Sequence, residues 1–108
     1  EEIIWDDHCK YEKLLIVLIL FFSYTSYSQT AEEYFNRGID KSKLKDYYGA
    51  ISDYTTAIEL DPDYRNAYVN RGIAKELIND LNGACLDWKK AAELGDTTSA
   101  KWVSNNCN

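Results

Sequence analysis

The chain has 108 residues, of which 45% are hydrophobic, and a formal net charge of −6 at pH 7. This length allows one small domain. An acidic chain without a basic stripe argues against nucleic acid as a partner, and the sequence shows no cofactor-binding motif.

The first 28 residues have the order of a secretory signal peptide. Residues 14–22 are an uninterrupted apolar run, preceded by Lys10 and Lys13 and followed by a small-x-small sequence at 26–28. Nine apolar residues are fewer than the roughly 20 that a membrane-spanning helix needs. We expect cleavage after Ser28 and a periplasmic or secreted product. The alternatives are an uncleaved membrane anchor, or a helix packed on the rest of the chain.

The residues before the apolar run are unusual for a signal peptide. The chain has no methionine, and five acidic residues lie within residues 1–12. We expect residues 1–9 to precede the true translation start, with a genuine acidic leader as the alternative. Removal of residues 1–28 would leave 10 basic and 13 acidic residues, a net charge of −3.

The rest of the chain contains a duplication with a period of 34 residues. Segment 31–64 is followed by a second copy from Arg65, and 13 of 34 aligned positions are identical. Self-similarity at such a period is typical of stacked helical repeats, in which each unit buries its apolar face on the next. The repeat therefore predicts an all-α short solenoid.

The repeated positions resemble the tetratricopeptide repeat, which runs large aromatic, Gly, Ala, aromatic, Ala, Pro. The first copy has these residues at Tyr34, Gly38, Ala50, Tyr54, Ala57 and Pro62, and the second has Tyr68, Gly72, Ala84, Trp88 and Ala91, with Asp96 in place of Pro. The resemblance implies two helical hairpins, 31–64 and 65–96, within a domain at 29–108. Gly and Ala let the two helices of a hairpin approach closely, and the aromatic residues fill the space beside that contact.

The missing second Pro predicts that the array ends after two copies. Gly95 followed by Asp96-Thr97-Thr98 indicates a helix end and then a new N-cap. We expect a capping helix at 99–106, within a cap segment at 97–107, whose Ala100, Trp102 and Val103 cover the open end.

Charged residues recur at identical places in the two copies. The seventh position is Arg37 or Arg71, where the family favours Leu, and we expect its stem to lie over the packing with its head in water. Asp53 and Asp87 also repeat, and we interpret them as surface positions set by the fold.

The resemblance implies a concave groove lined by the first helix of each hairpin, which receives a peptide or protein segment. The positions that commonly face this groove carry over to Glu32, Phe35, Ile39, Ser42, Lys43, Asn66, Val69, Ile73, Glu76 and Leu77. Apolar residues spaced four apart on each helix would form an apolar strip with mixed charge at one edge. The alternative is that Phe35, Ile39, Val69 and Ile73 only pack against each other, the cap or the N-terminal segment.

Two cysteines, Cys85 and Cys107, would remain after cleavage. In the repeat register Cys85 aligns with Ile51, a position that faces the following helix in this family, and Cys107 ends the capping helix. An exported protein favours a disulfide between them, and two unpaired thiols are the alternative.

The sequence offers no catalytic or metal-binding residues. His8 is the only histidine, and His8-Cys9 has no companion ligands at a usual spacing. We therefore predict a protein–protein interaction module, an adaptor or accessory protein of the cell envelope, and no enzyme. The alternative is a structural protein that self-associates through the exposed face near Ala31, and leaves its groove unused.

Overall fold

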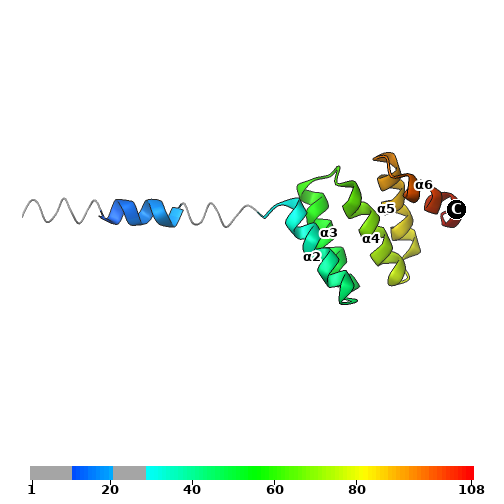
Figure 1. The fold of residues 1–108 in the computed structure, drawn as a ribbon, viewed down its shortest axis with the longest axis horizontal. Coiled ribbons are helices and arrows are strands. Elements are labelled where there is room, and N and C mark those ends of the chain that lie inside the picture. The colour runs from blue at the N-terminus through cyan, green and yellow to red at the C-terminus, as the bar shows by residue number, and fades with distance from the viewer. Residues whose placement is uncertain (1–10, 21–28) are drawn as a thin grey trace, which may run out of the picture.

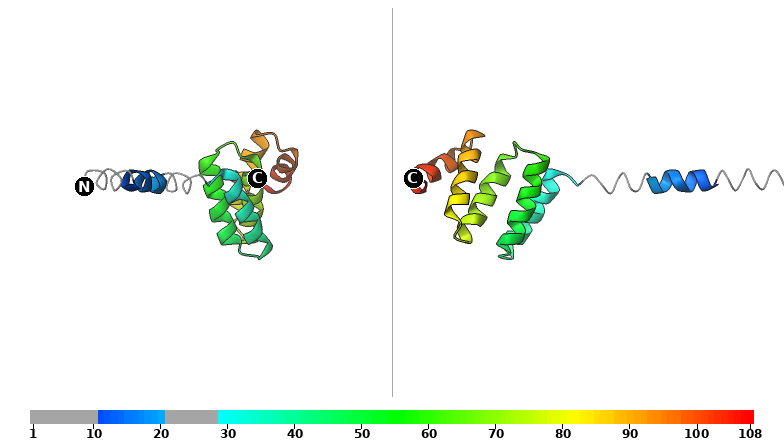
Figure 2. Two further views of the ribbon diagram at one scale, coloured as in Figure 1. Left: turned by 60° about the vertical axis from the view of Figure 1, so that its left-hand side comes forward. Right: turned by 180° about the vertical axis from the view of Figure 1, so that it is seen from behind.

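The computed structural model describes residues 11–20 and 29–108 of the chain. Within 29–108 there are five helices: α2 (Ala31–Lys43), α3 (Tyr47–Leu60), α4 (Arg65–Leu77), α5 (Leu81–Glu93) and α6 (Thr97–Asn106). Residues 11–20 are also helical, and none of the described residues forms a strand. Figures 1 and 2 show α2–α5 as neighbouring antiparallel helices, with the α2–α3 and α4–α5 turns at one edge and the α3–α4 loop at the other. This confirms the prediction of an all-α short solenoid.

Repeated turn residues set the helix boundaries. Asp46 and Asp80 cap α3 and α5 by accepting a hydrogen bond from the N–H of Gly49 and Gly83. The residue before each cap, Lys45 or Asn79, has a positive φ of 62° or 67°, which reverses the chain after the preceding helix. The two hairpins therefore turn in the same way.

Inside each hairpin, a glycine allows an aromatic ring to lie against the partner helix. A Cβ at Gly38 would overlap the ring of Tyr54, and a Cβ at Gly72 would overlap the indole of Trp88. Tyr54 and Trp88 are only 1% and 2% exposed. The predicted close approach at these glycines is thus present in both copies.

The hairpins pack on each other through α3 and α4. Ala50, Tyr54 and Ala74 form the buried cluster between them, and partly buried residues of the first hairpin surround it: Phe35, Ile39, Tyr47 and Ile51. Small residues at Ala50 and Ala74 let the helices approach, and Tyr54 fills the space beside them.

The last helix caps the solenoid, but its bounds and inward face differ from the prediction. Asp96 is the N-cap and α6 begins at Thr97, two residues before the expected start. Ser99 is fully buried and Ala100 is exposed, so Ala100 does not cover the open end. Trp102 does cover it, because its ring lies 5.1 Å from the ring of Trp88.

The helical residues 11–20 are exposed along their length. The side chains from Leu14 to Leu20 are more than half exposed. None of the described helices has the length and apolar character needed to cross a membrane. The predicted cleavage sequence at 26–28, the end of the apolar run at 21–22, and His8-Cys9 lie outside the described residues.

Candidate binding groove

An open cavity of about 320 Å³ lies between the first helices of the two hairpins. We call it the first cavity. Its walls come from α2 and α4, and its floor includes Tyr47 and Tyr54 of α3. It is lined by Ile39, Ser42, Lys43, Tyr47, Tyr54, Asn70, Ile73 and Leu77.

Polar side chains from the two first helices hold the floor of this cavity. The Tyr54 hydroxyl interacts with the side chains of Ser42 on α2 and Asn70 on α4. Burial raises the pKa of Tyr54 above its ordinary value, so the hydroxyl stays protonated at neutral pH. The cavity is therefore neutral at its floor, with Lys43 as the charged group on its lining.

A second cavity of about 270 Å³ lies between α4 and the cap. It is lined by Ile73, Glu76, Trp88, Trp102 and Asn106. Because Ile73 lines both cavities, they adjoin at this residue, and we call the two together the groove. An extended or helical segment that crosses α4 could contact both.

The structure brings six of the ten predicted groove residues to these cavities: Ile39, Ser42, Lys43, Ile73, Glu76 and Leu77. The other four, Glu32, Phe35, Asn66 and Val69, line neither. The Phe35 ring instead packs 5.8 Å from the ring of Tyr54 and 4.9 Å from that of Tyr64. The Phe35 ring therefore packs against other aromatic residues of the domain and lines neither cavity.

The sequence prediction missed the lining residues outside the ten family positions. Three of them lie on the second helices: Tyr47, Tyr54 and Trp88. Asn70 lies on α4 at a position outside those ten, and the cap contributes Trp102 and Asn106. A groove defined by first helices alone cannot include these residues. For Tyr54 and Trp88 the sequence signal is their aromatic character, at positions where rings fill the space beside a hairpin contact.

A carboxylate is buried in each hairpin, which corrects the interpretation of Asp53 and Asp87 as surface positions. The two residues are only 5% and 3% exposed. Asp53 forms ion pairs with Lys41, at 2.9 Å, and Arg37, at 3.6 Å. We expected the charged heads of Arg37 and Arg71 to lie in water. Each instead forms an ion pair with the buried carboxylate of its hairpin.

The second copy has the same arrangement with a shorter arginine contact. Arg71 donates two hydrogen bonds to Asp87, at 2.6 and 2.9 Å, and Lys75 lies 2.9 Å from the same carboxylate. Arg71 also donates to the Thr55 hydroxyl of α3 at 3.1 Å. One arginine, one lysine and one aspartate recur together in the two copies. This joint repetition is the sequence signal for a buried carboxylate that is paired with two cations.

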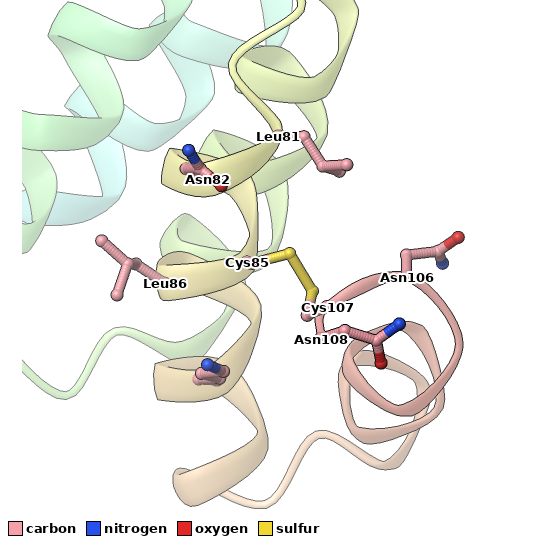
Figure 3. Close-up of a pocket in the computed structure, with 8 residues that line it drawn as sticks. Leu81, Asn82, Cys85, Leu86, Asn106, Cys107 and Asn108 are labelled. Atoms are coloured by element: carbon pink, nitrogen blue, oxygen red, sulfur yellow. A yellow bond between two sulfur atoms is a disulfide. The ribbon is translucent and has the colours of Figure 1, made fainter.

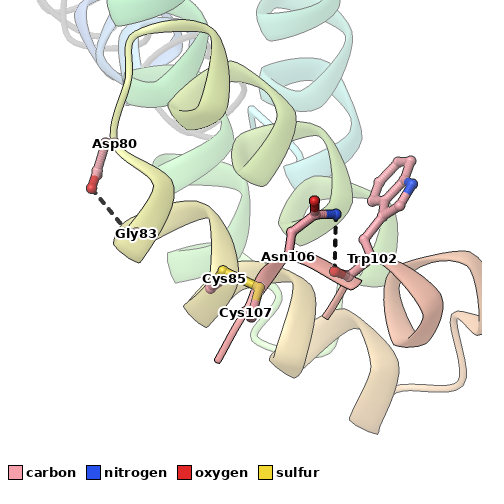
Figure 4. The surroundings of a disulfide bond; sticks show 6 residues. All are labelled: Asp80, Gly83, Cys85, Trp102, Asn106 and Cys107. Atoms are coloured by element: carbon pink, nitrogen blue, oxygen red, sulfur yellow. Dashed lines mark hydrogen bonds between the residues drawn. A yellow bond between two sulfur atoms is a disulfide. The ribbon is translucent and has the colours of Figure 1, made fainter. Parts of the chain in front are cut away.

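A third cavity, about 480 Å³, lies outside the groove and beside a disulfide. Figure 3 shows the Cys85–Cys107 bridge between α5 and the chain end, with Leu86 pointing away from it. The Cα atoms of the two cysteines are 5.7 Å apart. In Figure 4 Asn106, next to Cys107, donates from its side chain to the Trp102 carbonyl, at 3.2 Å. The bridge therefore fixes the end of α6 that forms one wall of the second cavity.

The described residues contain no group of His, Cys, Asp and Glu side chains that could hold a metal ion. Three carboxylates of the second hairpin and the cap have structural contacts: Asp80 and Asp96 cap helices, and Asp87 is paired. The groove as described is a surface for contact, with apolar and aromatic walls and one charge of each sign.

Comparison with known families agrees with this geometry. A family model described as the tetratricopeptide repeat matches residues 31–64, which comprise α2, α3 and the loop that follows. No curated protein matches the chain. The match falls on one copy of the 34-residue duplication, and the fold has two such hairpins, which supports a protein of the tetratricopeptide repeat family.

Proposed function

We propose that this protein binds a peptide or protein segment in the groove, as an adaptor or accessory protein of the cell envelope. Tetratricopeptide repeats generally mediate protein–protein interaction, and the family is typically not enzymatic. The observation that carries the proposal is the adjoining pair of cavities across α4, which share Ile73. Apolar walls with few polar groups suit a segment that carries apolar anchors.

The competing function, self-association through the face near Ala31, has less support. In α4, Ala67 and Ala74 are fully buried, and Ala74 packs against α3. The equivalent residues of α2, one repeat earlier, are Glu33 and Asp40, and both are exposed. A second copy stacked there would bury these carboxylates, which costs free energy unless they are paired. Sedimentation of the protein at increasing concentration tests this, since stacking requires an association that grows with concentration.

Site-specific photo-crosslinking in the source cells tests the groove. A photoreactive residue replaces Leu77, a groove residue that is 53% exposed, and in a matched variant it replaces Leu86, which is 68% exposed on α5 outside both groove cavities. We expect a discrete crosslinked partner from position 77 and none from position 86. The same partner from both positions, or from position 86 alone, would overturn the proposed groove.

Export is a separate part of the proposal. The exposed apolar helix at 11–20 has the character of a removable segment rather than a core element. We expect protein isolated from the envelope to begin at Gln29. An N-terminus before residue 20 in a membrane pellet would instead indicate an uncleaved anchor.

A further inference from the structure

We propose that the second cavity binds a cationic side chain, lysine or arginine, of the segment held in the groove. This inference rests on the proposed function and names the chemistry of one contact. It follows from three features of the cavity: two tryptophan rings, an acidic residue and a side-chain amide.

The tryptophan rings form an aromatic corner. Their centroids are 5.1 Å apart and their planes are inclined by 54°. Trp88 is held in place by burial, whereas Trp102 is partly exposed and can present its ring to a ligand. The face of an indole attracts cations, and it also packs well against the alkyl stem of lysine or arginine.

Glu76 gives the cavity its charge. It lies at the cavity wall, is exposed, and forms no ion pair among the described residues. The nearby cations Arg71 and Lys75 are already paired with Asp87. The carboxylate of Glu76 is therefore available to a ligand.

Asn106 supplies a further acceptor. Its side-chain N–H donates to the Trp102 carbonyl, which leaves its side-chain oxygen for another donor. An ammonium or guanidinium group has several donors and no acceptor, so it matches a carboxylate and an amide oxygen together.

The first cavity differs at the equivalent place. The residue one repeat before Glu76 is Ser42, which interacts with the Tyr54 hydroxyl, and the charged group of that cavity is Lys43. A ligand anion is favoured near Lys43 and disfavoured near Glu76. An apolar side chain in the second cavity would desolvate the Glu76 carboxylate without compensation. The charges thus favour a cation in the second cavity only.

The test uses two blocked amino acids of similar length, N-acetyl-lysine methylamide and N-acetyl-norleucine methylamide. Each is titrated into the purified protein while the indole N–H resonance of Trp102 is followed by NMR. We expect lysine to bind at least about fivefold more tightly than norleucine, since a cation–π contact and an ion pair together contribute about 1–2 kcal/mol.

Glu76→Gln is the informative variant, and Glu59→Gln is its control, because Glu59 is an exposed carboxylate outside both cavities. The preference for lysine should fall strongly in E76Q and persist in E59Q. Equal binding of the two probes, or an unchanged preference in E76Q, overturns the inference. Failure here with a partner crosslinked at position 77 rejects the cation site alone, whereas a lysine preference without any crosslinked partner rejects the proposed function.

Discussion

At Asp53 and Asp87 the duplicated sequence places the same carboxylate in two different surroundings. Both are buried and each faces one arginine and one lysine of the preceding helix. Arg71 is enclosed because α3 packs beside α4 and supplies Thr55 as a further partner. The Arg37 side chain is 50% exposed, compared with 16% for Arg71. The pairs of the second hairpin are therefore less screened by water.

We expect Asp87→Asn to destabilise the protein more than Asp53→Asn. Loss of the charge leaves cations without their partner, and this costs more where they are enclosed. The expected losses are about 2–3 kcal/mol for D87N and about 1 kcal/mol for D53N, since exposed pairs contribute little. Urea unfolding at neutral pH measures both.

The two variants serve as controls for each other, because they change the same residue at the same register of two hairpins. Equal losses would show that the enclosure by α3 has no energetic effect. A smaller loss in D87N would contradict the prediction outright.

The sequence was sufficient to locate these charges but not to pair them. Repetition of Arg37, Lys41 and Asp53 shows that the fold uses these positions. It does not show which way the Asp side chain turns, because that depends on the rotation of α3 against α2. Arg in place of the expected Leu does not by itself indicate a partner 16 residues away.

Among the elements, α6 is a short helix with a capping carboxylate at its start. It has ten residues, and isolated helices of that length are marginal in water. Asp96 caps it by accepting from the Ser99 N–H at 2.7 Å. The Ser99 side chain and the hydrogen bond from the Ser99 N–H lower the pKa of Asp96 below its ordinary value of 3.8. The ionised carboxylate is therefore the form that stabilises the cap.

The charge of Asp96 should stabilise the folded protein at neutral pH and lose this effect in acid. Because its pKa is lower in the folded state than in the unfolded state, the contribution is fully present above about pH 4 and is lost as the pH falls through the folded value. We expect Asp96→Asn, which keeps a capping acceptor but cannot ionise, to be less stable than wild type at pH 7. That difference should shrink as the pH is lowered below 3.8. Urea unfolding of both proteins over this range measures it, and a difference that stays constant or grows would contradict the assigned cause.

The sequence predicts the helices and part of the groove, but it does not predict every helix boundary. The five helices follow from the 34-residue period and the capping residues, so the fold was predictable. The start of α6 was not, because Asp96, Thr97 and Thr98 can all cap a helix, and only packing selects Asp96 by burying Ser99. The groove was predictable where it uses first helices. Its far end was not, because the cap has no counterpart in the repeat pattern.

At the scale of the whole domain, two hairpins are few for a repeat array. Each unit relies on its neighbours for a buried surface, and three or more repeats are usually needed. Here α6 supplies the missing neighbour of α5, with Trp102 on Trp88, and the Cys85–Cys107 bridge ties its end to α5. A disulfide stabilises chiefly by restricting the unfolded chain, in the loop-entropy account.

We expect the double variant Cys85→Ser, Cys107→Ser to lose about 3 kcal/mol of unfolding free energy, given the separation of 22 residues between the two cysteines. The second cavity should open at the same time, because Asn106 and Trp102 form its wall. Urea unfolding followed by tryptophan fluorescence measures the first effect. Hydrogen exchange of α6 measures the second.

Wild-type protein treated with a dithiol reductant is the matched control. It should unfold like the double variant, and the reductant should leave the variant itself unchanged. Without reductant and under denaturing conditions, alkylation should modify neither Cys85 nor Cys107. If both react, or if the variant is as stable as untreated wild type, then the contacts of α6 with α5 hold the cap unaided. The end of the solenoid would in that case be closed by its tryptophans alone.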